Sequence, residues 1–154
     1  LRMAKPDATK EEMEAVLQKV NLLGFLQTQN GLQTELLEKA GNLSGGQCQR
    51  LVIARALLRS DSAVYIFDEA ASNIDVESEE LIMNVIHELA KTKTVLLISH
   101  RLANVVQSDQ IYFLKNGTIC ERGTHAELME QNGAYRHLYD SQMVLENYGK
   151  QGNA

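Results

Sequence analysis

The segment Leu43-Ser44-Gly45-Gly46-Gln47 combines residue types that suit contact with a phosphate group. Ser44 and Gln47 have the spacing of a capping box, which opens a helix. Gly45 and Gly46 carry no side chain, so the backbone can come close to a ligand, and the N-terminus of a helix attracts anions. Taken alone, the segment is equally consistent with a capping box and nothing more.

No G-x-x-x-x-G-K-[ST] motif accompanies this segment anywhere in the 154 residues. The nearest match, residues 41–48, has Gln47 where the phosphate-binding lysine belongs and Cys48 where the Mg²⁺-binding hydroxyl belongs. The match to this motif is therefore only superficial, and if the segment is half of a phosphate site, the other half remains to be located.

Two carboxylates and a histidine follow short apolar runs. Asp68 and Glu69 come directly after residues 63–67, and His100 comes two residues after residues 94–98. Asp68 could hold a hydrated Mg²⁺ and Glu69 could orient a water molecule. Taken singly, such an acidic pair is more often a solvated turn, and a lone histidine more often caps a helix or packs.

Both apolar runs have the length and composition of parallel strands that are covered on both faces. Between them, apolar residues recur at helical spacing over residues 81–89, and Asp75 precedes this helix as an expected N-cap. This is the pattern of a β-α-β unit. The carboxyl ends of its strands bind ligands in open α/β sheets, so the two polar clusters should lie side by side.

The other elements are expected from local signals. We predict a helix over residues 10–23, capped by Thr9 and ended by Gly24, and a loop over 27–42 with a short helix near 36–39. A further helix runs from Ser44 to about residue 58. Asn116-Gly117 predicts a hairpin over residues 111–120, a helix follows Thr124, and a frayed tail begins near residue 149.

Composition narrows the class of protein. Hydrophobic residues make up 44% and charged residues 23%, which is typical of a folded domain, and the net charge of -5 argues against a nucleic-acid partner. The longest apolar runs are far shorter than the roughly 20 residues of a membrane helix. Cys48 and Cys120 have no metal-ligand spacing and are expected to be free thiols, with a single disulfide between them as the alternative. The chain begins at Leu1 without methionine, so we expect a fragment of a larger protein.

The motifs occur together in an order that resembles the ATP-binding cassette (ABC) ATPases over residues 1–145. The resemblance implies that Leu43 to Gln47 form the signature motif, which contacts ATP together with the D-loop aspartate Asp75. It makes Asp68 the Walker B aspartate, acting on Mg²⁺, and Glu69 and His100 the catalytic glutamate and switch histidine.

The resemblance also implies the fold class. It is an α/β, P-loop NTPase-like ABC ATPase domain that lacks its N-terminal half, because the P-loop, the adenine-stacking aromatic residue and the Q-loop glutamine are all missing. We divide the chain into a helical subdomain (1–59), part of the parallel-sheet core (60–145) and a C-terminal tail (146–154). Cys48, Ala71 and Asn73-Ile74 depart from the family pattern without removing a catalytic group.

The implied function is ATP hydrolysis coupled to transport, with ATP and Mg²⁺ as ligands. The partners would be a second ABC ATPase domain, in a head-to-tail homo- or heterodimer, and the transmembrane domain of a bacterial exporter at the cytoplasmic face of the cell membrane. The isolated chain should be inactive and should self-associate. The alternatives are a non-transport ABC-type ATPase acting on DNA or the ribosome and a non-catalytic interaction module.

Overall fold

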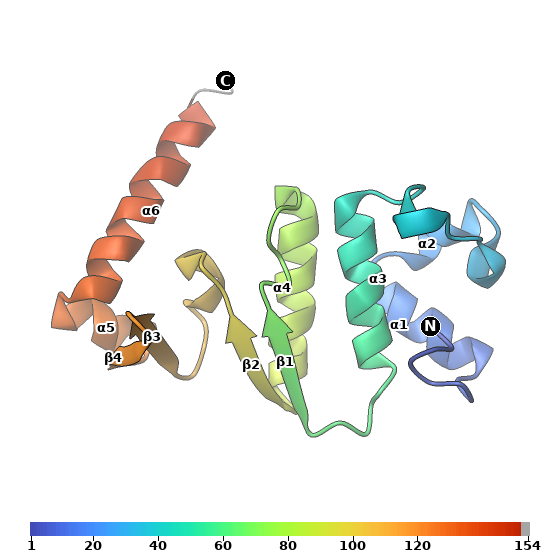
Figure 1. Cartoon of the computed structure of the whole chain (residues 1–154), viewed down its shortest axis with the longest axis horizontal. Coiled ribbons are helices and arrows are strands. Elements are labelled where there is room, and N and C mark those ends of the chain that lie inside the picture. The colour runs from blue at the N-terminus through green and yellow to red at the C-terminus, as the bar shows by residue number, and fades with distance from the viewer. Residues whose placement is uncertain (152–154) are drawn as a thin grey trace. The chain divides into compact units, whose positions relative to one another are not determined.

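The computed structural model describes residues 1–151, apart from the side chains of Lys39 and residues 146–151. The chain forms two compact units, which we call unit 1 (residues 1–98) and unit 2 (from Ser99 onward). Figure 1 labels their helices and strands. Each unit is described by itself.

Unit 1 begins with a group of helices that precedes its strands. In chain order they are α1 (Lys10–Lys19), α2 (Leu23–Gln27), the 3-10 helices η1 (Gly31–Gln33) and η2 (Glu38–Ala40), and α3 (Gly45–Leu57). The predicted capping box at Thr9 is present, since its hydroxyl accepts from the Glu12 N–H at 3.2 Å while the Glu12 carboxylate accepts from the Thr9 N–H at 2.9 Å. The predicted helix from Ser44 is α3.

The first helix ends earlier than we predicted. Asn21 adopts a left-handed conformation with φ of 50°, and its N–H donates to the Gln18 carbonyl while the Leu22 N–H donates to the Leu17 carbonyl. This pair of bonds is a Schellman motif with asparagine at the position that glycine usually takes. The prediction that Gly24 ends the helix is therefore wrong, because Gly24 lies inside α2.

The β-α-β unit is confirmed. β1 (Val64–Asp68) and β2 (Thr94–Ile98) are parallel and joined through α4 (Val76–Ala90), and Asp68 lies opposite Ile98 at their carboxyl ends. In Figure 1, α4 lies behind the two strands. Tyr65 and Phe67 point from β1 into the core, which stacks their rings at 6.4 Å between centroids.

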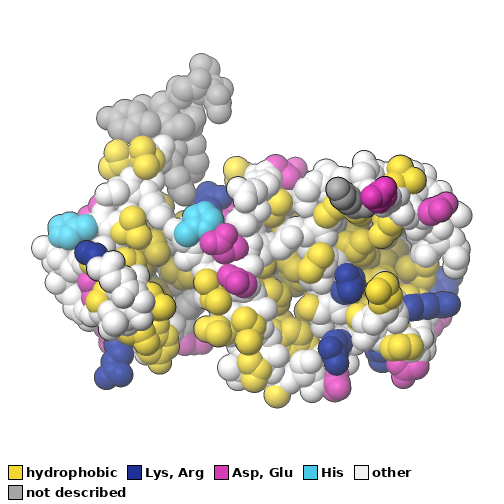
Figure 2. Space-filling view, viewed as in Figure 1, with side chains coloured by type: hydrophobic (Ala, Val, Ile, Leu, Met, Phe, Trp, Pro, Cys, Tyr) yellow, Lys and Arg dark blue, Asp and Glu magenta, His cyan; other side chains and the backbone are white. Residues whose placement is uncertain are grey.

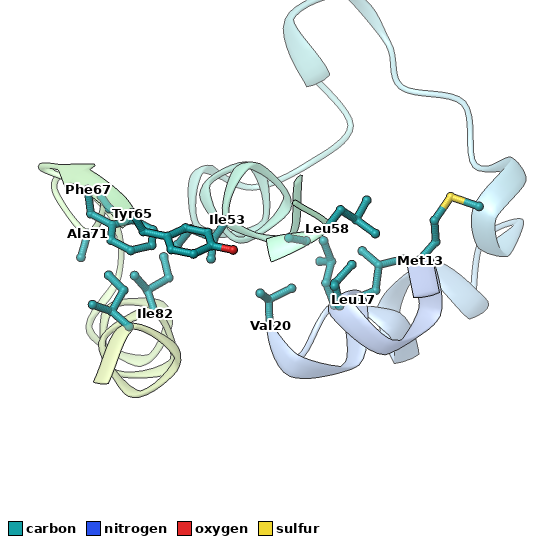
Figure 3. Close-up of a cluster of buried hydrophobic side chains, with 14 of the residues drawn as sticks. Met13, Leu17, Val20, Ile53, Leu58, Tyr65, Phe67, Ala71 and Ile82 are labelled. Carbon is teal, nitrogen blue, oxygen red and sulfur yellow. The ribbon is translucent and has the colours of Figure 1, made fainter. Parts of the chain in front are cut away.

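One hydrophobic core joins α4 and the strands to α1 and α3. Figure 3 shows Met13 and Leu17 of α1 together with Val20, its C-cap residue, while Ile53 of α3 lies beside the aromatic side chains of β1. Removing such side chains from water is the main stabilising contribution to folding, at about 25 cal/mol per Å². The second half of α3 and the strand β1 are therefore fixed to the same core.

The opposite face of the two-stranded sheet is open, contrary to the expectation that both faces are covered. Val64, Ile66, Leu96 and Ile98 alternate with the inward residues and are between 46% and 65% exposed. Figure 2 shows yellow hydrophobic side chains gathered over these strands. The described helices of unit 1 cover the other face, where Tyr65 and Phe67 point, so these strands carry more apolar side chains than unit 1 buries.

Unit 2 is built around a hairpin and two helices. Its elements are the 3-10 helix η3 (Leu102–Val105), β3 (Ile111–Lys115), β4 (Thr118–Gly123), α5 (His125–Gln131) and α6 (Ala134–Gln151). The hairpin prediction is confirmed, with φ of 52° at Asn116 and 78° at Gly117, as a type I′ turn requires. The predicted cap at Thr124 is also present, because its hydroxyl accepts from the Glu127 N–H at 3.3 Å.

The helix α6 is fixed at its N-terminal end. The Glu121 carboxylate, from β4, accepts from the N–H groups of Ala134 and Tyr135. Tyr135 is fully buried, and its hydroxyl lies 2.8 Å from Nδ1 of His125. A carboxylate at a helix N-terminus satisfies otherwise unpaired donors and interacts favourably with the helix dipole.

The helix α6 continues to Gln151, beyond residue 145, where we had ended the core. Residues 152–154 of the predicted tail lie outside the described residues, and the division at residues 59 and 145 stays a prediction. Within residues 1–151, no helix combines the length and the hydrophobicity that crossing a bilayer requires. Cys48 and Cys120 are both free thiols, as predicted.

Candidate functional site

The signature segment forms the first turn of α3. The Ser44 hydroxyl accepts from the Gln47 N–H at 3.2 Å, and the Gln47 side-chain oxygen accepts from the Ser44 N–H at 2.9 Å. Ser44 and Gly45 are exposed, and a Cβ added at Gly45 would meet nothing within 4 Å. This helix N-terminus is thus preformed and open to an anion at Gly45.

Gly46 lies in a different environment, where neighbouring residues of the same chain leave no room for a side chain. It is buried, and a Cβ at this position would collide with the Ser78 hydroxyl and come within 2.7 Å of the Ser78 Cβ and 3.0 Å of the Asp75 carboxylate. The first turns of α3 and α4 therefore meet at this glycine. Gly46 is therefore needed for packing, and the expectation that both glycines allow a ligand to approach stays a prediction.

Asp75 acts as the N-cap of α4, as its position predicts. Its Oδ1 accepts from the Ser78 N–H at 2.8 Å. Hydrogen bonds from the Ser78 N–H and hydroxyl hold the pKa of Asp75 below its usual range, and the positive charge of Arg50 adds to this effect. The carboxylate stays ionised, next to the signature helix.

Arg50 ties this junction to the first helices of unit 1. Its Nε donates to the Gly46 carbonyl at 3.4 Å and its Nη1 donates to the Asn21 carbonyl at 3.1 Å. Asn21 is the left-handed residue that ends α1. The position of the signature helix therefore depends on Arg50, Gly46 and the Schellman motif together.

Asp68 and Glu69 stand at the carboxyl end of β1, and both are exposed. The Glu69 N–H donates to the Ile98 carbonyl at 2.9 Å, which extends the pairing of β1 and β2 by one residue. Glu69 has φ of 49°, and its carbonyl accepts from the Ser72 N–H at 3.0 Å. A non-glycine residue in the left-handed region is unusual, and such residues are concentrated at functional sites.

His100 belongs to unit 2, where it follows Ser99 at the start of the loop before η3. It is exposed, and its carbonyl accepts from Nε2 of Gln142 at 2.8 Å. The Ser99 hydroxyl accepts from the Arg101 N–H at 3.0 Å, which closes a tight turn around His100. The imidazole is therefore presented by a backbone held on both sides.

Within unit 1 the structure brings the signature glycine Gly46 and the D-loop residue Asp75 together, and it places Asp68 beside Glu69. Sequence reasoning missed Ser78 and Gln142. Ser78 stands at the N3 position of α4, three residues after the cap, so a capping pattern could have indicated it. Gln142 contacts a loop some 40 residues earlier, and no local signal points to it.

The residues present fit Mg²⁺ that is bound together with a nucleotide. Within the described part of the chain, no three His, Cys, Asp or Glu side chains are grouped as a self-sufficient metal site. Mg²⁺ usually takes one or two carboxylates plus substrate phosphates and waters, which Asp68 at an exposed strand end can provide. The roles of Asp68 and of the other site residues remain predictions.

Comparisons with known proteins identify relatives of the chain. The sequence model of the ABC transporter family matches residues 2–72. An ABC transporter ATP-binding protein of Haemophilus influenzae is 51% identical over the whole chain, which covers 27% of that protein. An ATP-dependent lipid A-core flippase of Mannheimia succiniciproducens is 46% identical over 90% of this chain and 24% of its own length.

A solved structure gives the same result for the fold. The structure of a bacterial Atm1-family ABC exporter with ATP bound matches 91% of this chain with a TM-score of 0.81 and 30% sequence identity, over 24% of its own length. The chain spans about a quarter of the length of the relatives it matches. It is an α/β chain that belongs to the ABC transporter family, where it matches the C-terminal portion of the ATPase domain.

Proposed function

We propose that the chain is the C-terminal part of the ATPase domain of an exporter and takes part in ATP hydrolysis that drives transport. One observation carries the proposal: an open, N-capped signature turn and a left-handed glutamate at the end of β1 occur in the same unit. The first suits phosphate contact and the second suits the positioning of a water molecule. Relatives named as exporters and flippases support this function.

The proposed roles follow from the placement of each residue. Ser44 and the N–H groups of Gly45 and Gly46 would contact the γ-phosphate of ATP bound to a second ATPase domain. Asp68 would hold Mg²⁺, which neutralises phosphate charge when it is bound. Glu69 would orient the attacking water and His100 would hold the γ-phosphate and that water in line. Catalysis of this kind relies on positioning and electrostatics.

The proposed partners are a second ABC ATPase domain and a transmembrane domain, with the ATPase domains at the cytoplasmic face of the cell membrane. The open turn at Gly45 supports a partner domain, because unit 1 itself leaves that position uncovered. The net charge of -5 does not favour a nucleic-acid partner.

The test is the steady-state ATPase activity of the full-length exporter. Glu69→Gln keeps the size and hydrogen bonding of the side chain but removes its negative charge, so kcat should fall by about 10²-fold or more while ATP still binds. His100→Ala should also lower kcat with little change in ATP affinity. Glu80→Gln is the matched control, because Glu80 is an exposed carboxylate on α4 outside the proposed site.

Near-normal turnover of Glu69→Gln would exclude the role given to Glu69. If the wild-type exporter binds ATP without hydrolysing it, the chain is a non-catalytic module, and the proposed function is wrong.

A further inference from the structure

The side-chain amide of Gln142 makes two hydrogen bonds to the loop that carries His100. Its Nε2 donates to the His100 carbonyl at 2.8 Å, and its Oε1 accepts from the Leu102 N–H at 2.9 Å. The amide thus uses a donor and an acceptor at once, and it contacts the backbone on both sides of Arg101. Gln142 is half-buried and Leu102 is buried, so water does not readily replace the second bond.

The element that carries Gln142 is well anchored within unit 2. The Glu121 carboxylate caps the N-terminus of α6, and Gly133 leaves room for it, because a Cβ there would come within 2.6 Å of the carboxylate. The buried Tyr135 fixes the first turn through its hydroxyl contact with His125 and its edge contact with Phe113. Gln142 lies two turns further along the same helix.

We propose that Gln142 is a positioning residue for His100, and that its side-chain amide links the place of the switch histidine to α6. The inference rests on the proposed function, in which His100 contacts the reacting phosphate. A histidine on an exposed loop contributes to catalysis only when its backbone is held, since a displacement of about 1 Å costs up to about 10²-fold in rate. Ser99 limits the turn locally, and Gln142 fixes it to a helix.

The variant Gln142→Met keeps the length and unbranched shape of the side chain and suits a helix, but it removes both polar groups. In the full-length exporter, kcat should fall about 10- to 100-fold, while KM for ATP should change less than about twofold. Ser141→Ala is the matched control, because within the described residues the Ser141 hydroxyl donates to the His137 carbonyl of its own helix, and activity should not change.

A double-mutant cycle with His100→Ala separates positioning from a general loss of structure. If Gln142 acts through His100, then Gln142→Met should change kcat less than about twofold in the His100→Ala background. An equal loss in both backgrounds would overturn the inference, as would full activity of Gln142→Met while His100→Ala is impaired. Full activity of His100→Ala would instead show that the proposed role of His100 is wrong, and the inference would fail with it.

A second variant and a second readout keep the test decisive if Gln142→Met does not fold. Gln142→Glu keeps the acceptor for the Leu102 N–H but places a carboxylate oxygen against the His100 carbonyl, which repels it, so it can carry the same cycle with a loss at least as large. Amide hydrogen exchange at Leu102 should be faster by about tenfold or more in Gln142→Met than in Ser141→Ala. Equal exchange at Leu102 in both variants would contradict the inference.

Discussion

The signature turn and the carboxylates after β1 belong to the same unit but are supported in different ways. The signature turn has its own capping box, a tight contact between Gly46 and Ser78, and Arg50 bridging to the end of α1. Asp68 and Glu69 stand at the end of a two-stranded sheet with one covered face and one open apolar face.

The signature turn is thus supported by contacts within unit 1, whereas the strand end that carries Asp68 and Glu69 depends on how well its sheet is covered. A turn whose donors and packing partners lie within unit 1 can keep its geometry by itself. The geometry of a strand end depends on the stability of its sheet. Parallel sheets are stable when both faces are covered. We therefore expect the signature turn to be intact in the 154-residue chain and the carboxylates to be less precisely held.

The largest expected effect is that the isolated 154-residue chain neither binds ATP tightly nor hydrolyses it. One helix N-terminus contributes on the order of 1 kcal/mol to phosphate binding, whereas binding near 50 µM requires roughly 6 kcal/mol. We expect neither tight Mg-ATP binding by calorimetric titration nor measurable phosphate release. The full-length protein is the positive control. Micromolar binding by the chain alone would show that the carboxylates and the signature turn already form a complete site.

A matched pair of glycine substitutions tests the support of the signature turn. Gly46→Ala places a methyl group against Ser78 and should reduce the free energy of unfolding by about 1–3 kcal/mol, whereas Gly45→Ala points into open space and should change it by less than about 0.5 kcal/mol. Urea unfolding of the 154-residue chain measures both. Ser78→Gly should restore part of the loss in Gly46→Ala. Equal stability of the two single variants would mean that the contact at Gly46 is not tight.

A charge on the open sheet face tests the other half of the comparison. The exposed apolar residues of β1 and β2 should make the 154-residue chain self-associate through this face, because large contiguous apolar patches are rare on monomers. Ile66→Lys should shift the sedimentation profile toward monomer. Leu114→Lys, at a similarly exposed residue of the hairpin, should not. A wild-type chain that sediments as a clean monomer at high concentration contradicts this expectation.

The smallest effect concerns pH at the junction of α3 and α4. The pKa of Asp75 is lowered in the folded state by the Ser78 N–H and hydroxyl and by Arg50, so its contribution to stability is present above the ordinary aspartate value of about 3.9 and is lost as the pH falls through the lowered value. Asp75→Asn should keep a good N-cap at pH 7 but should lose less stability on acidification than the wild type. Unfolding curves between pH 7 and about pH 3 measure the difference. Parallel acid limbs would contradict it.

Local patterns in the sequence were sufficient to predict where the elements that position the site begin and turn. Ser44 with Gln47 predicts the start of α3, Asp75 predicts the start of α4, and Asn116-Gly117 predicts the hairpin turn. Each of these signals is a short-range hydrogen bond or a backbone conformation that depends on residues a few positions away.

What could not be predicted depends on contacts between distant segments or on competition between local signals. The end of α1 is set by Asn21, although Gly24 is the more usual residue for such a position. Gly46 meets Ser78 only because α3 and α4 pack against each other, and Gln142 meets the His100 loop from a helix that begins more than thirty residues later. The sequence predicts strands suited to two covered faces, but it does not show that one face of this sheet is open.

The left-handed backbone at Glu69 has a consequence for protein engineering and natural variation. At φ of 49°, glycine or asparagine adopts the backbone conformation at a lower free-energy cost than glutamate. Replacing Glu69 by one of them should therefore raise the thermal stability of the fold. Such a substitution would also remove the carboxylate that the proposed function requires. Selection for heat resistance and selection for turnover should therefore act in opposite directions at this residue, and variants stabilised by Glu69→Gly or Glu69→Asn should be the ones that lose activity.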